Sequence, residues 1–279
     1  MKDVCESLIS LVASDRPGRG PSRLCRWDML SRALELLSGA SRVGVVTGFF
    51  IPSAGVPETD GPGGAVALAR ALLLCGKEVS LWTDSSCFSV VQGASSAIGG
   101  PPVSVAVSGP EVLDWGPDLL VYIERLGRAE DGEYYNMRGQ AITSTVVPLD
   151  EGLLLASQRG IKSISVGDGG NEAGMGKLFE GLSRILPGYG SCLSVVSSDV
   201  AIPVDVSDWG GYALAGLLSM ESGLWCGVSG EEIRAMIEAE VAEGAVDGVT
   251  LLGSPSVDGF PLEDQMAIGE DIRRLTAPV

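Results

Sequence analysis

Acidic side chains gather in three glycine-containing loops, and this grouping is the first feature of the sequence that could do chemistry. In the first loop, Glu58 and Asp60 lie two residues apart among prolines and glycines. In extended chain this spacing points both carboxylates to the same side, which suits a hard cation bound through oxygen. The alternative is structural, because Asp60 or Thr59 could cap the helix that we expect to follow.

The second loop begins at Glu124 and Arg125, which end a short apolar run. A strand at this position would bury one of the two charges, and a buried charge must be paired or must hold a ligand. An internal salt bridge from Glu124 to Arg125 or Arg138 is the alternative. Further along the loop, Asn136 and Arg138 offer donors that could hold a substrate carboxylate, the arginine in bidentate fashion.

The third loop begins at Asp168, at the end of another short apolar run. Gly169 and Gly170 form a turn that glycine makes easily, and Asn171 and Glu172 open an expected helix. Free N–H groups at such a helix start can bind an anion. The alternative is a tight turn with Asp168 as a local cap.

Other motifs are absent or weaker. The third loop is not a Walker A motif, because Leu178 follows Lys177 where Ser or Thr is needed, and no G-x-G-x-x-G marks a strand-to-helix turn. Lys177 is a second candidate for charge stabilisation, or a solvated side chain. We expect Asp208 to cap a helix and Asp258 to be a turn residue.

Composition narrows the chemistry further. The 279 residues include 19 Lys and Arg, 36 Asp and Glu and no histidine, for a formal net charge of −17. This excludes Ser-His-Asp and Cys-His catalysis and a histidine-ligated zinc site. The six cysteines form no C-x-x-C pair, so we expect buried free thiols. A metal site in this chain would have to be built from oxygen ligands.

The same composition bears on partners and location. With no basic cluster, the chain lacks the charge pattern that nucleic-acid binding needs. No apolar run approaches the ~20 residues of a membrane-spanning helix. Asp3 and Glu6 stand where a signal peptide would carry positive charge. We therefore expect a cytoplasmic protein that binds a small molecule, and the sequence leaves open whether it forms a homo-oligomer.

Apolar periodicity and glycines divide the chain into alternating strands and helices. The expected strands cover 42–49, 77–83, 103–107, 119–123, 163–166 and 193–196. The expected helices cover 27–37, 65–75, 86–97, 151–159, 172–186, 211–220 and 231–242. This alternation predicts an α/β fold: a mainly parallel sheet with helices on both faces, a three-layer sandwich. We expect one domain over residues 1–279, although the tail from Gly244 could form an appended arm.

Ligands of such sheets collect at the carboxyl ends of the strands. The three acidic loops each follow an expected strand, so their side chains should converge on one site. Thr47, at the end of the first of these strands, is expected to contact the substrate.

The loops also carry a family resemblance. Seven segments resemble, in this order and from about residue 30 to residue 261, the C-terminal domain of the D-glutamate cyclase family and its stand-alone microbial relatives: TGFFIP, PETDGPGGA, IERLGR, DGEYYNMRG, VGDGGNEAGMGK, SDWGGYALAG and SVDG. These motifs are long and unusual, and the match covers nearly the whole chain.

The resemblance implies reversible dehydration of D-glutamate to 5-oxo-D-proline, with a divalent cation, Mg or Mn, held by acidic side chains. The expected metal ligands are Glu58, Asp60, Asp168 and Glu172. Glu124 or a metal-bound water would take a proton from the α-amino group, and Asp168 would be the second catalytic carboxylate. The expected substrate contacts are Thr47, Asn136, Arg138, Gly169, Gly170 and Asn171.

Two other functions fit the same residues. A metal-dependent hydrolase of a small phosphorylated or carboxylated compound could use the glycine turn to cradle phosphate. A non-catalytic domain could bind an amino-acid-like molecule for a partner enzyme, with the acidic residues holding a structural cation.

Overall fold

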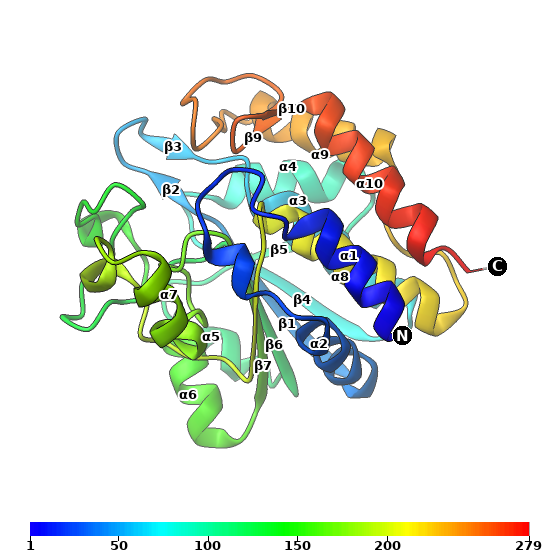
Figure 1. Ribbon diagram of the computed structural model, residues 1–279, viewed down its shortest axis with the longest axis horizontal. Helices are drawn as coiled ribbons and strands as arrows, with labels where there is room; N and C mark the ends of the chain where they lie inside the picture. The colour runs from blue at the N-terminus through cyan, green and yellow to red at the C-terminus, as the bar shows by residue number, and fades with distance from the viewer. Residues whose placement is uncertain (279) are drawn as a thin grey trace.

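Six parallel strands form the central sheet of the computed structural model, which describes residues 1–278 (Figure 1). In spatial order they are β5 (Val103–Val105), β4 (Glu78–Thr83), β1 (Arg42–Thr47), β6 (Leu119–Ile123), β7 (Lys162–Gly167) and β8 (Val200–Pro203). Successive strands step outward from β1 on both sides, so the strand order reverses between β1 and β6. In open α/β sheets this switch point is where ligands bind.

Two short antiparallel pairs lie outside the sheet. They are β2 (Phe50–Ile51) with β3 (Val56–Pro57), and β9 (Ser256–Val257) with β10 (Phe260–Pro261). The first pair follows β1 and the second precedes the last helix, and each carries acidic residues of the site described below.

Helices cover both faces of the sheet. They are α1 (Lys2–Val12), α2 (Trp27–Gly39), α3 (Pro62–Leu74), α4 (Phe88–Ala97), α5 (Gly109–Asp114), α6 (Glu151–Arg159), α7 (Phe179–Ile185), α8 (Ser207–Ser222), α9 (Gly230–Ala242) and α10 (Leu262–Thr276). Alternate strand residues point to opposite faces. Val45 and Val121 pack with α1–α4 and α8–α10, whereas Val46 and Tyr122 pack with α5 and α6. The predicted three-layer α/β fold is confirmed.

The contact between α3 and α8 brings the starts of two helices together. α3 is apolar all round and almost wholly buried, as expected for a helix inside a core. A Cβ at Gly211 would lie 2.4 Å from the carbonyl oxygen of Gly64, and a Cβ at Gly64 would lie 2.7 Å from the Asp208 Cα. The two helices can approach this closely only because both positions are glycine.

The expected strand at 193–196 is wrong, because the sixth strand is β8, Val200–Pro203. Residues 193–196 instead lie along the second and third acidic loops, where Ser194 N–H donates to the Gly170 carbonyl and Val195 N–H to the Arg128 carbonyl. A short apolar run is buried in this position as it would be in a strand, so its composition does not separate the two.

The expected helix at 172–186 begins late, at Phe179, after a short 3-10 helix at Gly176–Leu178. Glu172 folds its side chain back onto the preceding turn rather than opening a helix. Gly174 adopts a left-handed φ of 102°, which interrupts helical conformation.

The remaining expected strands and helices are present with ends shifted by a few residues. The helices α1, α5 and α10 were not among those expected. The tail from Gly244 does not stand apart as an arm, because α10 packs against α1, α8 and α9, and its Ile268 and Ile272 belong to the larger core.

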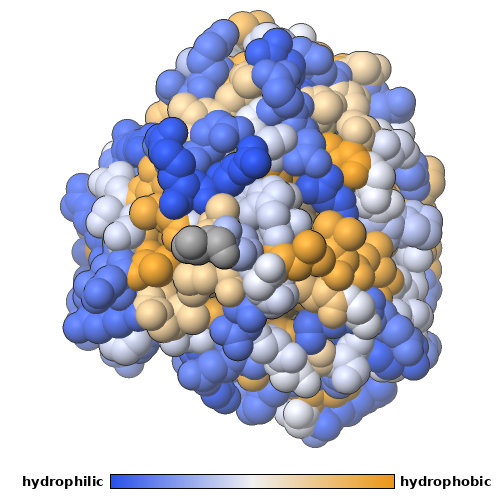
Figure 2. All heavy atoms as spheres, turned by 90° about the vertical axis from the view of Figure 1, so that its right-hand side faces the viewer, coloured by the Kyte–Doolittle hydropathy of each residue, from blue (hydrophilic) through white to orange (hydrophobic). Residues whose placement is uncertain are grey.

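Both ends of the described chain lie on the same face, where α1 packs against α10 (Figure 1). Figure 2 shows that hydrophobic and hydrophilic residues are interspersed on this face. Exposed apolar residues are common on globular proteins and indicate no special role by themselves. Within residues 1–278, no helix combines the length and the hydropathy that crossing a membrane requires.

Candidate functional site

A pocket of about 290 Å³ lies at the carboxyl ends of the central strands, where the acidic loops meet. Its wall contains five carboxylates, and we call it the acidic pocket: Glu58, Asp60, Glu124, Asp168 and Asp258. Five further polar side chains lie in the wall, Arg19, Ser53, Asn136, Arg138 and Asn171, and apolar residues such as Phe49 and Met137 form the rest. The predicted convergence of the three acidic loops is therefore present in the structure.

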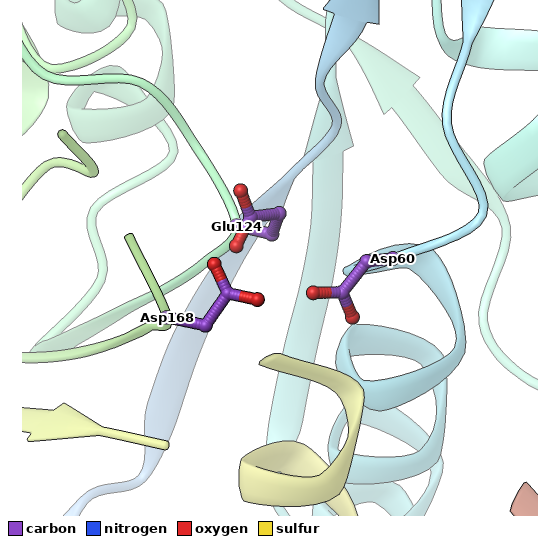
Figure 3. Close-up of side chains that lie close together, drawn as sticks. All are labelled: Asp60, Glu124 and Asp168. Carbon is purple, nitrogen blue, oxygen red and sulfur yellow. The ribbon is translucent and has the colours of Figure 1, made fainter. Parts of the chain in front are cut away.

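Asp60, Glu124 and Asp168 form the centre of the acidic pocket. One carboxylate oxygen from each lies within 4.8 Å of the others, so the three could hold a metal ion together. They come from three separate elements, the start of α3, the end of β6 and the end of β7, and their carboxylates turn toward a common point (Figure 3). All three are buried, with exposed fractions of 1%, 5% and 4%.

Asp60 is fixed by the first residues of α8. Its Oδ2 accepts the Ser207 N–H at 2.9 Å and its Oδ1 accepts the Asp208 N–H at 2.9 Å. Asp208 in turn accepts the N–H groups of Gly61 and Gly64 at the start of α3, at 2.9 and 2.6 Å. Asp60 also accepts the N–H of the next residue, Gly61, at 2.9 Å, but the first N–H groups that it caps are those of α8, and the predicted cap at Asp208 serves α3.

Glu124 and Arg125 are both buried, and they point to different places. Glu124 has a left-handed φ of 45°, and its Oε2 accepts the Ser207 hydroxyl at 2.6 Å. Arg125 pairs with Asp84 at 2.5 Å. Neither salt bridge offered as an alternative for Glu124 is present among residues 1–278. The Glu124 carboxylate is thus left for the pocket.

The path of the chain at Glu124 depends on a glycine across from it. Gly61 has φ of 101°, and a Cβ there would lie 2.6 Å from the Glu124 Cβ and 2.9 Å from the Thr47 Oγ1. Thr47 is fully buried behind this contact, and its hydroxyl has no hydrogen-bond partner within the described chain. It lies next to the carboxylates and not in the pocket wall.

Asp168 meets an arginine that the sequence did not single out. The Arg19 Nη2 lies 2.6 Å from Asp168 Oδ2 and 2.6 Å from Asp258 Oδ2. The same nitrogen donates to the Asp205 carbonyl at 2.6 Å. Its hydrogen bonds go to Asp258 and Asp205, so Asp168 Oδ2 is a buried carboxylate oxygen that accepts no hydrogen bond from residues 1–278.

Glu172 holds the turn that follows Asp168. Its Oε1 accepts the N–H groups of Asp168 and Gly169 at 2.9 and 2.6 Å, and its Oε2 accepts that of Gly170 at 2.7 Å. Both oxygens are engaged, and Glu172 is not one of the three clustered carboxylates. The geometry therefore gives no support to Glu172 as a metal ligand or to these glycine N–H groups as anion donors.

The other predicted site residues lie around the pocket. Glu58 is in the wall but outside the group of three. Asn136, Arg138 and Asn171 line the same pocket. Asn136 accepts the Arg138 N–H and so stabilises its own turn, and the Asn171 amide donates to the Tyr135 carbonyl at 2.8 Å. Arg138 itself is exposed.

Two residues of the pocket escaped the sequence analysis. Asp258 does occupy the expected turn, between β9 and β10, but its left-handed backbone, with φ of 54°, also places the carboxylate on the pocket. Arg19 belongs to no motif, and its partner Asp258 lies 239 residues away along the chain. Only the Gly, Pro and Arg content of 16–21 marked a loop there.

Burial dominates the electrostatics of the pocket. It raises the pKa well above the ordinary value in four of the carboxylates, Glu58, Asp60, Glu124 and Asp168. Repulsion from neighbouring carboxylates raises these pKa values further, whereas Arg19 opposes the shift at Asp168. The pocket therefore favours bound protons or bound cations.

The residues present fit a hard divalent cation. Mg²⁺ and Mn²⁺ prefer oxygen ligands, and the three clustered carboxylates supply only oxygen. The burial of all three carboxylates adds to this fit, because buried negative charge is costly unless it meets a cation or a proton.

The chain is similar to known proteins over most of its length. The family model described as D-glutamate cyclase-like, C-terminal, matches residues 8–273. The human protein named D-glutamate cyclase, mitochondrial, is 36% identical over 263 residues, which cover 85% of this chain and 42% of the human protein. The chain thus spans less than half the length of that relative.

A solved structure is also similar to this chain, at a greater distance. The structure of an exopolyphosphatase-related protein from Bacteroides fragilis has a TM-score of 0.44 and 10% identity, over 91% of this chain and 61% of that one. This likeness is too distant to argue from. Because the family model covers almost the whole chain, the protein belongs to the D-glutamate cyclase-like, C-terminal family.

Proposed function

We propose that this chain is a metal-dependent lyase that interconverts D-glutamate and 5-oxo-D-proline, with loss of water in the direction of ring closure. The observation that carries the proposal is the buried group of Asp60, Glu124 and Asp168, with one carboxylate oxygen of each within 4.8 Å of the others, in a pocket of about 290 Å³. Pockets of about this size suit small ligands. Membership of the family and the name of the human relative supply the substrate.

Asp60, Glu124 and Asp168 would hold the cation in this proposal. A bound Mg²⁺ or Mn²⁺ supplies Lewis acidity toward the γ-carboxylate of glutamate, which is otherwise a poor electrophile. Asp60 is oriented by the α8 N–H groups, and Glu124 by the Ser207 hydroxyl. Glu172 holds the turn that sets the Asp168 backbone.

Ring closure also requires protons to move from nitrogen to oxygen. The α-ammonium group must lose two protons to become the lactam N–H, and the departing γ-carboxylate oxygen must gain two to leave as water. Glu58 and Asp258 are the wall carboxylates outside the group of three. Asp258 pairs with Arg19, so Glu58 would be the one to accept and return a proton. Arg138 and Asn136 would hold the α-carboxylate on the other side of the pocket.

The proposal treats residues 1–279 as one catalytic domain, and a direct assay tests it. Purified chain loaded with Mn²⁺ or Mg²⁺ should convert D-glutamate to 5-oxo-D-proline and the reverse, as followed by chiral chromatography, with metal content measured on the same sample. Asp168→Asn should lower both metal content and turnover at least 100-fold. Asp264→Asn, at an exposed position of α10, is the matched control and should leave both unchanged.

A second function would use the same pocket, the binding of an amino-acid-like ligand without turnover, because Asn136 and Arg138 line the pocket and could hold a carboxylate. The same samples separate the two functions. Thermal stabilisation by D-glutamate or 5-oxo-D-proline with no product in either direction would support the binding domain and contradict the lyase.

A further inference from the structure

Arg19 is delivered to the acidic pocket by a firmly anchored segment. The Asp205 carboxylate, at the end of β8, accepts three consecutive backbone N–H groups, those of Ser14, Asp15 and Arg16, at 3.1, 2.8 and 3.1 Å. The Asp15 carboxylate then accepts the Gly20 N–H at 2.7 Å. The backbone on both sides of Arg19 is therefore held in place, and this anchoring directs the Arg19 side chain into the acidic pocket.

The surroundings of the Arg19 Nη2 resemble those of a metal ion more than those of a hydrogen-bonded group. Three oxygens lie 2.6 Å from this one nitrogen: Asp168 Oδ2, Asp258 Oδ2 and the Asp205 carbonyl. A guanidinium NH₂ has only two hydrogens to donate, so one of the three contacts rests on charge alone.

Asp168 is shared between this position and the group of three carboxylates. One of its oxygens belongs to that group, and its Oδ2 contacts Arg19. In two-metal sites the ions lie close together, about 3.5–4 Å apart, close enough to share ligands. The acidic pocket thus has two adjoining positions for a cation, with Asp168 between them and Asp258 on the far side.

We propose that the Arg19 guanidinium occupies the place of a second cation and so restricts the acidic pocket to one divalent ion. The proposal rests on the proposed function only in that the first ion binds at Asp60, Glu124 and Asp168. Arg19 is on this view a specificity-determining residue: it sets how many ions bind. Removing its charge should open the second position, between Asp168, Asp258 and the Asp205 carbonyl.

The test is the number of Mn²⁺ ions bound per chain, measured by titration with detection of free Mn²⁺ by electron paramagnetic resonance. The wild type should bind one ion and Arg19→Met two, the second lost again in the double variant Arg19→Met/Asp258→Asn. Arg19→Lys, which keeps the charge, should bind one. The control is Arg23→Met, an exposed arginine four residues away that pairs with Asp15, and it should bind one.

An unchanged count of one ion for Arg19→Met, with unchanged affinity, overturns the proposal. A wild type that binds no Mn²⁺ contradicts the metal site of the proposed function instead. The difference in ion count between Arg19→Met and the wild type still tests the role of Arg19. A gain of one ion supports that role, and no gain refutes it. If Arg19→Met does not fold, Arg19→Gln takes its place, because it is neutral and can still donate to the Asp205 carbonyl. A count equal to the wild type for that variant likewise refutes the proposal.

Discussion

Asp60 and Asp208 each cap the helix that the other begins. The Asp60 carboxylate accepts the first N–H groups of α8, and the Asp208 carboxylate accepts those of α3. The exchange is possible because Gly64 and Gly211 let the two helices approach closely. It gives Asp60 two roles, since the carboxylate that ties the helices together also faces the acidic pocket.

Replacing Asp208 should therefore destabilise the fold and also disturb the acidic pocket, although Asp208 is not in the pocket wall. Asp208→Ala leaves the Gly64 N–H group without its acceptor and the Gly61 N–H group with Asp60 alone, and loss of a cap costs about 0.5–2 kcal/mol. Urea denaturation should show a fall in unfolding free energy of that size. Asp264→Ala, at an exposed site, should change it by less than about 0.5 kcal/mol. Equal effects of the two substitutions would contradict the capping role.

The Ser207 hydroxyl should affect the affinity of the acidic pocket for metal but not the stability of the fold. Its hydroxyl donates to Glu124, whereas its backbone N–H donates to Asp60 and survives substitution. Removing a side chain that orients a ligand lowers metal affinity about 10–100-fold. We expect Ser207→Ala to lower Mn²⁺ affinity by that factor in calorimetric titration. Ser222→Ala, at the other end of α8, is the control, and a shared loss of affinity would count against the assignment.

Gly61 should tolerate no side chain. Gly61→Ala would place a methyl carbon 2.6 Å from the Glu124 Cβ, whereas Gly55→Ala, also at a left-handed glycine, meets nothing within 4 Å. Gly61→Ala adds this clash to a backbone with φ of 101°, whereas Gly55→Ala adds only the strain of a backbone with φ of 72°. We expect Gly61→Ala to lose about 1–3 kcal/mol more than Gly55→Ala in urea denaturation. The close contact would be in doubt if the two variants lost the same amount.

Glu240 should make the protein less stable as pH rises. It is fully buried in α9, both carboxylate oxygens lack a hydrogen-bond partner within the described chain, and burial raises its pKa well above the ordinary value. The folded chain keeps this proton at pH values where the unfolded chain has released it, so unfolding becomes easier as pH rises toward the folded pKa.

Glu240→Gln removes this titration. The unfolding free energy of Glu240→Gln minus that of the wild type should be lowest at pH values below the ordinary pKa of glutamate. This difference should rise steadily as the pH is raised. Urea midpoints at pH 5 and pH 8 check this, because groups common to both proteins cancel in the difference. A difference that does not change with pH would show that Glu240 has no raised pKa.

Local patterns predicted most of the fold. Two runs of apolar residues stand between polar or glycine residues, Val43 to Val46 and Leu119 to Ile123. This pattern is typical of buried parallel strands. The residues at 193–196 leave the same mark for another reason, since they are buried under the acidic loops. Only the position of β8 in the sheet distinguishes Val200–Pro203 from residues 193–196, and that position depends on tertiary contacts that the local sequence does not show.

The candidate site was predictable where a residue ends a strand and not where a distant segment completes the pocket. Asp168 and Glu124 follow β7 and β6, so their convergence could be inferred from the parallel sheet. Arg19 and Asp258 lie in loops whose local sequence says nothing of the pocket. The role of Glu172 was also beyond the sequence, because an acid beside a glycine turn can either face a ligand or bind the turn's own N–H groups.

The anchoring of Ser14 to Arg16 by Asp205 has a consequence for how the molecule is made. The contact between Arg19 and Asp258 joins residues 239 positions apart, and the anchor itself spans about as much of the chain. Contacts of such long sequence separation form late in folding, because loop closure must precede them. During synthesis, residue 258 is made after Asp60, Glu124 and Asp168, so the acidic pocket cannot be complete until nearly the whole chain has been synthesised.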